Sequence, residues 1–255
     1  MSRSLTLLWH QLRFSQKVFW RNPGSVFFTV LLPVLLLVIF GTIFGSDPIP
    51  SLGGIPTTDY YVPAIASLAV VSATFLNLGM NLTIARETGL LKRLRGTPQP
   101  AWLFIAGKVA NAVVISALMV ILITAVGAAL YGAPPPWEGL GALVLSLVLG
   151  AACFCCLGIA MTAVIPSREA APAVMNLITL PLYFLSGVFI PESEIPEGVL
   201  RFADLFPVRN LFEAFLAAYE PAITGFAWAP LAVLVLWGAA GFLLAARFFR
   251  WTPSR

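Results

Sequence analysis

Long apolar runs dominate the chain and alternate with short polar segments. Six of these runs approach or exceed the roughly 20 residues that an α-helix needs to cross the hydrocarbon core of a bilayer. They cover residues 25–44, 60–85, 101–130, 138–165, 171–190 and 226–249. The pattern therefore predicts an all-α integral membrane protein with six transmembrane helices. An even number of spans places both termini on the same side.

The first 24 residues follow a different pattern. Apolar residues form one stripe at helical spacing and basic residues form another. The apolar stripe is Leu5, Leu8, Trp9, Leu12 and Phe19, and the basic stripe is His10, Arg13, Lys17 and Arg21. We expect residues 1–24 to form an amphipathic helix in the cytoplasmic interface, with its cations near anionic headgroups. Residues 25–255 then form the transmembrane domain.

The segment 190–221 is too polar to span the membrane, yet apolar residues recur at helical spacing on both sides of Phe206-Pro207. This predicts two short re-entrant helices at the outer face, which are tolerated where they pack against protein or a water-filled cavity. The charged side chains of the segment form either a solvated face or part of an outer gate. They are Glu192, Glu194, Glu197, Arg201, Asp204, Arg209, Glu213 and Glu220.

Composition and charge support a membrane protein and orient it. The chain is 59% hydrophobic and 10% charged, whereas about a quarter of the residues of a soluble domain are charged. The net charge of +4 does not indicate nucleic-acid binding, because the basic residues flank the apolar runs. Thirteen of the fifteen Lys and Arg residues fall on the side of the termini, and only Arg201 and Arg209 fall on the other. The excess predicts cytoplasmic termini for a multi-pass protein of the cell membrane.

The charged segment 86–98, between the second and third runs, has the features of a short helix. Glu87 lies in its expected first turn, and Lys92, Arg93 and Arg95 lie in its last turn, as the helix dipole favours. Gly96 and Pro98 are placed to end it. Leu90, Leu91 and Leu94 are expected to share one face that docks a soluble partner. The alternative is an ordinary cytoplasmic loop, whose orientation alone explains its cations.

The chain is poor in catalytic groups. Gly107-Lys108 lacks the flanking residues of a Walker A loop, so no phosphate cradle and no ATP hydrolysis are expected. His10 fits the solvated face of the first helix, and Cys153, Cys155 and Cys156 fit an apolar helix rather than a metal site. No Asp, Glu or Arg lies in the middle of a predicted span, which counts against an ion-coupled carrier. Lys108 either extends its amine back to the interface or contacts a partner.

Some polar and aromatic residues of the spans are candidates for a transport path. They are Phe75, Asn77, Met80, Asn81, Asn176 and Phe184. Amide side chains in a membrane commonly hydrogen-bond between helices. The two interpretations, helix packing and a path between protomers, both remain open from the sequence.

Two motifs resemble a known family. One is Ala85-Arg86-Glu87-x-Gly89-x-Leu91-x-Arg93-Leu94-Arg95-Gly96-Thr97-Pro98, and the other is Pro191-x-x-x-Ile195-Pro196 followed by Phe206-Pro207. With the six spans and the amphipathic first helix, the chain resembles the membrane-spanning permease subunits of type-2 ABC exporters. Within that superfamily it looks most similar to small drug and antibiotic efflux permeases.

The resemblance implies a homodimer with two ATPase subunits on its cytoplasmic face. Mg-ATP would be bound by those partners, so that the chain needs no cofactor. The coupling helix would comprise Arg86, Glu87, Gly89, Leu90, Leu91, Lys92, Arg93, Leu94, Arg95, Gly96, Thr97 and Pro98, and the outer gate Pro191, Pro196, Phe206 and Pro207. The expected activity is ATP-driven export of a hydrophobic or amphipathic small molecule. Export of a lipid-linked glycan or polysaccharide, an ion-coupled carrier and a non-transporting sensor are the alternatives.

Overall fold

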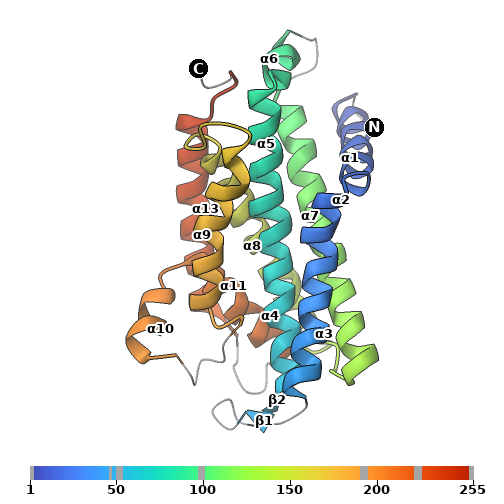
Figure 1. The fold of residues 1–255 in the computed structure, drawn as a ribbon, viewed down its shortest axis with the longest axis vertical. Coiled ribbons are helices and arrows are strands. Elements are labelled where there is room, and N and C mark those ends of the chain that lie inside the picture. Colours follow the sequence, from blue (N-terminus) through green and yellow to red (C-terminus); the bar gives the residue numbers. More distant parts are fainter. Residues whose placement is uncertain are drawn as a thin grey trace.

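The computed structural model describes residues 3–45, 48–49, 54–96, 101–189, 195–220 and 226–252. Its helices form an elongated bundle (Figure 1). The short helix α6 (Leu90–Arg95) and both chain ends lie toward one end of the bundle. The strands β1 (Pro48–Ile49) and β2 (Ile55–Pro56) pair antiparallel at the other end. This arrangement agrees with the prediction that the termini and the charged segment share one side.

Five of the described helices are long and apolar enough to cross a membrane. The first runs from Pro23 to Phe44 through α2 (Pro23–Val26), a π-helical stretch η1 (Phe27–Leu31) and α3 (Leu32–Phe44). The second runs from Thr57 to Glu87 through α4 (Thr57–Val71), a π-helical stretch η3 (Ser72–Asn77) and α5 (Leu78–Glu87). The others are α7 (Ala101–Tyr131), α8 (Leu140–Met161) and α13 (Trp228–Phe248).

The predicted fifth span, 171–190, is only partly confirmed. The corresponding helix α9 (Ala170–Leu185) has 16 residues, a length of about 24 Å against the roughly 30 Å of a hydrocarbon core. The helix ends before Gly187, whose φ of 84° lies in the left-handed region. The Gly187 carbonyl oxygen instead accepts a hydrogen bond of 2.6 Å from Tyr60 Oη. The described residues thus contain five long spans and one shorter apolar helix.

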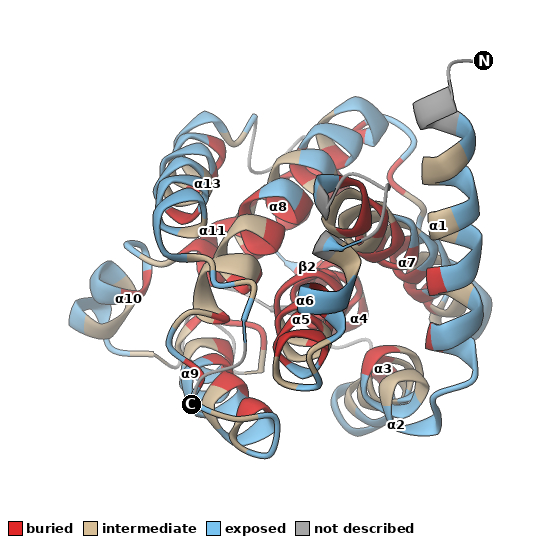
Figure 2. Ribbon diagram, turned by 90° about the horizontal axis from the view of Figure 1, so that it is seen from above, coloured by how far each residue is buried: buried red, intermediate tan, exposed pale blue. Residues whose placement is uncertain are grey.

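The second span forms the centre of the bundle. Seen along the bundle, α4 and α5 are surrounded by the other helices (Figure 2). Every residue of α4 from Tyr60 to Val71 is buried. A helix without a polar face is suited to such an interior position or to contact with lipid. Tyr60 packs edge-on against Phe212 at 5.2 Å, which ties the centre to the outer helices.

The predicted first helix is confirmed as α1 (Arg3–Trp20). It packs against α7 through a narrow face that includes the buried Ser15 and Phe19. Trp9 and Trp20 remain exposed. Figure 2 shows α1 from its side at the edge of the bundle, while α4 and α5 are seen end-on. The helix therefore lies at an angle to the bundle, as an interfacial helix requires.

The two short outer helices are also confirmed. They are α10 (Glu197–Ala203) and α11 (Pro207–Tyr219). Pro207 occupies the first turn of α11, where its missing N–H leaves no hydrogen bond unmade. Leu211 packs on Gly150 at the middle of α8, and Ala218 lies beside Gly139 at its outer end. Helix α11 therefore extends from mid-depth to the outer end of the bundle.

Candidate functional site

Arg86 anchors the cytoplasmic end of the second span. Its side chain is buried, and its Nε atom forms an ion pair of 2.6 Å with Glu87 Oε1. The guanidinium also donates to the carbonyl oxygens of Thr162 and of Ile165, the latter at 2.6 Å. These carbonyls belong to the turn after α8. Because a buried guanidinium is stable only when fully paired, this arrangement holds the end of α5 to the end of α8.

The charged segment is not a single helix, contrary to our prediction. Arg86 and Glu87 belong to the last turn of α5, and a new helix, α6, begins at Leu90. Gly89 joins the two with a φ of 71°, a conformation that favours glycine. Glu87 therefore does not lie in the first turn of a coupling helix. Gly96 is at the predicted end of α6, while Thr97 and Pro98 lie outside the described residues.

The three leucines of the segment do not form one docking face. Leu91 is fully buried in a small core with Leu82, Phe104 and Cys155, and Leu94 packs partly against the same core. Only Leu90 is clearly exposed, at 42%. The reason is that α6 folds back on its own bundle and uses two of its three leucines to hold itself there. The predicted apolar docking face is wrong in this respect.

The outer side of α6 is cationic. Lys92 and Arg93 are exposed beside Leu90, and Arg93 Nη2 donates to the Thr88 carbonyl oxygen at 3.3 Å. The buried Leu91 packs α6 onto the bundle, and the Arg86 contacts lie at the preceding end of α5. A partner that approaches the cytoplasmic end of the bundle meets one exposed leucine among cations.

The candidate path residues do not gather in one place. Phe75 lines an apolar cavity of about 470 Å³ between α8, α9 and α13. Met80 is half-buried. Asn176 is exposed and bonds the Pro172 carbonyl oxygen at 2.9 Å, and Phe184 is exposed and packs on Phe189 at 5.1 Å. Within one protomer, these positions do not form a continuous path.

Asn77 and Asn81 instead belong to a polar cluster between α1, α5 and α7. Asn77 Nδ2 donates to Thr29 Oγ1 at 3.3 Å, and Asn81 Nδ2 donates to Asn77 Oδ1 at 2.7 Å. Lys108 and Asn111 line the same small cavity. The Asn77–Thr29 bond connects the π-helical stretches η3 and η1. Such stretches are common at functional sites, and here the bond joins the first span to the second.

The outer-gate residues lie at the two helix starts. Pro196 precedes α10, and Phe206 and Pro207 begin α11. Phe206 stacks on Trp237 with ring centroids 6.2 Å apart, and Trp237 Nε1 donates to the Leu205 carbonyl oxygen at 2.7 Å. The start of α11 is therefore fastened to the middle of α13. Pro191 lies outside the described residues.

The predicted solvated face is wrong for Arg209. Its side chain is only 7% exposed, and it pairs with Asp204 and, at 2.8 Å, with Glu213 Oε1. A sequence signal for this burial was available. Asp204 and Glu213 lie five and four residues from Arg209, within reach of ion pairs, and an arginine is buried only when it is paired. Arg86 had a different signal, since it continues the i, i+4 series of the buried Leu78 and Leu82.

The described residues show no catalytic arrangement. Among them, no three His, Cys, Asp or Glu side chains gather as metal ligands. Cys153 and Cys155 are buried in α8 between apolar neighbours. The large cavity is lined mainly by apolar residues, and the small one by amides, hydroxyls and Lys108. The geometry is that of a membrane-type helical bundle with a short cationic helix at one end and the buried helix α11 near the other.

These features define a multi-pass α-helical membrane protein, and comparison with known proteins identifies its family. The family model described as ABC-2 type transporter matches residues 6–219. The chain belongs to the ABC-2 type transporter family. Its membrane domain is non-catalytic and binds no cofactor itself, and a permease of this family implies an ATPase partner subunit.

Individual relatives are distant. The chain is 25% identical to the inner membrane transport permease YadH of Escherichia coli K12 over 186 residues, which cover 73% of this chain and 72% of YadH. It is 26% identical to the putative transport permease ycf38 of Porphyra purpurea over 206 residues, which cover 79% of this chain and 69% of that protein. The ycf38 protein of Pyropia yezoensis is 27% identical over 210 residues.

Proposed function

We propose that this chain is the permease subunit of an ATP-driven exporter in the cytoplasmic membrane. Two copies would form the membrane channel, and an ATPase subunit would dock on the outer side of α6. The substrate would be a hydrophobic or amphipathic small molecule of drug or antibiotic type. YadH, an inner membrane transport permease, supports the location and the general activity.

The observation that carries the proposal is the connection between α6 and the centre of the bundle. Helix α6 joins α5 through the two residues Thr88 and Gly89, and α5 continues through η3 into the buried α4. Arg86 fixes this joint to the turn after α8. A push on α6 would therefore move two helices together. This is the mechanical requirement for coupling ATPase closure to the spans.

The charges inside the bundle favour an uncharged or amphipathic substrate. The two buried arginines, Arg86 and Arg209, are already paired with Glu87, Asp204 and Glu213. The remaining polar groups of the described spans are mostly hydroxyls and amides. Ion-coupled carriers commonly place ionisable side chains along their path, whereas the passage of an apolar molecule requires none.

Co-purification tests the docking surface. We would isolate the tagged chain from its native membrane in mild detergent and identify bound proteins by mass spectrometry. The variant Leu90→Asp/Arg93→Glu changes only exposed positions of α6. We expect a soluble ATPase with the wild-type chain and at least a tenfold loss with the variant. Leu94→Asp and Glu87→Ala are less suitable, because both residues also contact the chain's own core.

Arg168→Glu is the matched control. Arg168 is also an exposed arginine on the cytoplasmic side, but it lies in the turn before α9. The ATPase should remain bound to this variant. Equal retention in both variants would show that α6 is not the docking site. If no ATPase is recovered even after crosslinking, an ATP-independent carrier or sensor becomes the better explanation.

A further inference from the structure

The apolar cavity that Phe75 lines is a groove on the side of the bundle. Its floor is formed by Phe75 and Phe154, which are 7% and 2% exposed. Its rims are formed by α9 and α13, where Ile178, Leu244 and Phe248 are 37%, 48% and 51% exposed. The gradient from floor to rim shows that the groove opens sideways between α9 and α13. In a membrane that opening faces lipid.

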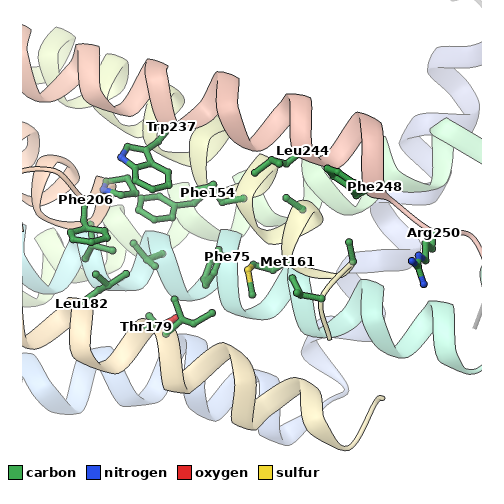
Figure 3. A pocket seen from close by; sticks show the side chains of 18 residues that line it. Phe75, Phe154, Met161, Thr179, Leu182, Phe206, Trp237, Leu244, Phe248 and Arg250 are labelled. Atoms are coloured by element: carbon green, nitrogen blue, oxygen red, sulfur yellow. The ribbon is translucent and has the colours of Figure 1, made fainter. Parts of the chain in front are cut away.

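The groove has the depth of one leaflet. Trp237 stands near the middle of the 21-residue helix α13, and Phe248 is its last residue. Eleven helical residues span about 16 Å, close to half of the roughly 30 Å of a hydrocarbon core. Figure 3 places Phe206 and Trp237 at one end of the groove and Arg250 at the other.

The end of the groove that lies at mid-membrane is bounded by Phe206 and Trp237. The Phe206–Trp237 stack and the bond from Trp237 Nε1 to the Leu205 carbonyl oxygen hold the start of α11 across it. The groove therefore does not continue into the outer half of the membrane. A molecule that lies in it must come from the cytoplasmic leaflet.

The other end of the groove is cationic. Arg250 follows α13 on the cytoplasmic side and lines the cavity. It is exposed, and among the residues that the structure describes no carboxylate pairs with it. A guanidinium at headgroup level is suited to a phosphate oxygen. The site thus combines an apolar slot one leaflet deep with a cation at its mouth.

We propose that the groove between α9 and α13 binds an anionic phospholipid of the cytoplasmic leaflet. One acyl chain lies against Phe75 and Phe154, with its end beneath the Phe206–Trp237 stack. The phosphate lies at Arg250. Lipid binding at this site does not depend on ATP or on the proposed docking surface. It is also independent of which substrate the permease carries.

Native mass spectrometry of the purified, delipidated chain tests this proposal. We would titrate it with phosphatidylglycerol or phosphatidylcholine and count bound lipids on each protein species. The wild-type chain should prefer phosphatidylglycerol. Arg250→Gln should reduce that preference roughly fivefold, as expected for the loss of one cation near a lipid headgroup. The matched control Arg247→Gln, an exposed arginine that does not line the groove, should retain it.

A second pair of variants tests the slot itself. Ala160 lines the groove from α8, so Ala160→Phe should lower the occupancy of both lipids. Ala152, on the same helix, is exposed and does not line the groove, so Ala152→Phe should have no effect. The exposed Arg250 variants remain informative if Ala160→Phe fails to fold.

Two results would overturn the proposal. One is an equal preference of the wild type and Arg250→Gln for the anionic lipid. The other is a shift of Ala160→Phe from dimer to monomer with unchanged lipid counts, which would show that a second copy of the chain covers the groove.

Discussion

At the scale of single residues, the role of a charged side chain depends on what surrounds it rather than on its place in the chain. Arg86 and Arg93 are seven positions apart in one charged segment. Arg86 is 1% exposed and holds two carbonyl oxygens and a carboxylate, whereas Arg93 is exposed on α6. The two arginines therefore differ in role, the first structural and the second available to a partner.

Arg86→Gln should destabilise the chain by about 3 kcal/mol, because it leaves Glu87 and the carbonyls after α8 without their partner. Arg93→Gln should change stability by less than about 0.5 kcal/mol, as is usual for an exposed position. The difference is measured by unfolding both variants in detergent while tryptophan fluorescence is monitored. Similar losses for the two substitutions would contradict the anchor role of Arg86.

At the scale of elements, close backbone approaches hold the re-entrant helix α11. A Cβ atom added at Gly139 would collide with the backbone carbonyl of Ala218. Two residues further on, a Cβ at Gly141 would meet nothing within 4 Å. The outer end of α11 therefore requires a glycine at position 139 but not at position 141.

Gly139→Ala should destabilise the fold by about 1–3 kcal/mol, because backbone atoms cannot move aside as a flexible side chain can. Gly141→Ala should be neutral or stabilising by up to about 1 kcal/mol, since alanine is favoured over glycine inside a helix. Comparative denaturation of the two variants, with limited proteolysis near residues 207–219, checks this. If Gly139→Ala leaves the protease resistance of α11 unchanged, the contact between Gly139 and Ala218 does not hold this helix in place.

At the scale of the whole molecule, the charges and the helix ends indicate the same orientation. The end of the bundle that carries α6 and both chain ends also carries most of the basic residues. The opposite end carries β1, β2 and the start of α8, with Glu138 exposed beside it. Only one insertion direction satisfies the excess of cations on the cytoplasmic side.

A membrane-impermeant thiol reagent can test this orientation. Glu138→Cys should be labelled in intact cells, whereas Arg168→Cys should be labelled only after the membrane is opened. Both positions are exposed, and the wild-type chain, with its three native cysteines inside α8, supplies the background. Labelling of Arg168→Cys in intact cells would reverse the topology and remove α6 from the reach of a cytoplasmic ATPase.

The sequence by itself determined the features that depend on local patterns. The apolar runs predicted the spans, the amphipathic stripe predicted α1, and Phe206-Pro207 marked the break between α10 and α11. These follow from transfer of each segment into lipid and from the backbone limits of proline, which act over a few residues. Even there, the length of α9 was overestimated, because its end is determined partly by the distant Tyr60.

Only the tertiary structure decided which side chains face inward and which segments meet. Leu91 and Leu90 are neighbours in sequence, yet one is buried and the other exposed because α6 folds onto α5 and α7. Arg86 finds its partners 76 and 79 residues away, and the groove needs α8, α9 and α13 together. Contacts of such separation arise from the packing of whole helices, which periodicity along one segment does not specify.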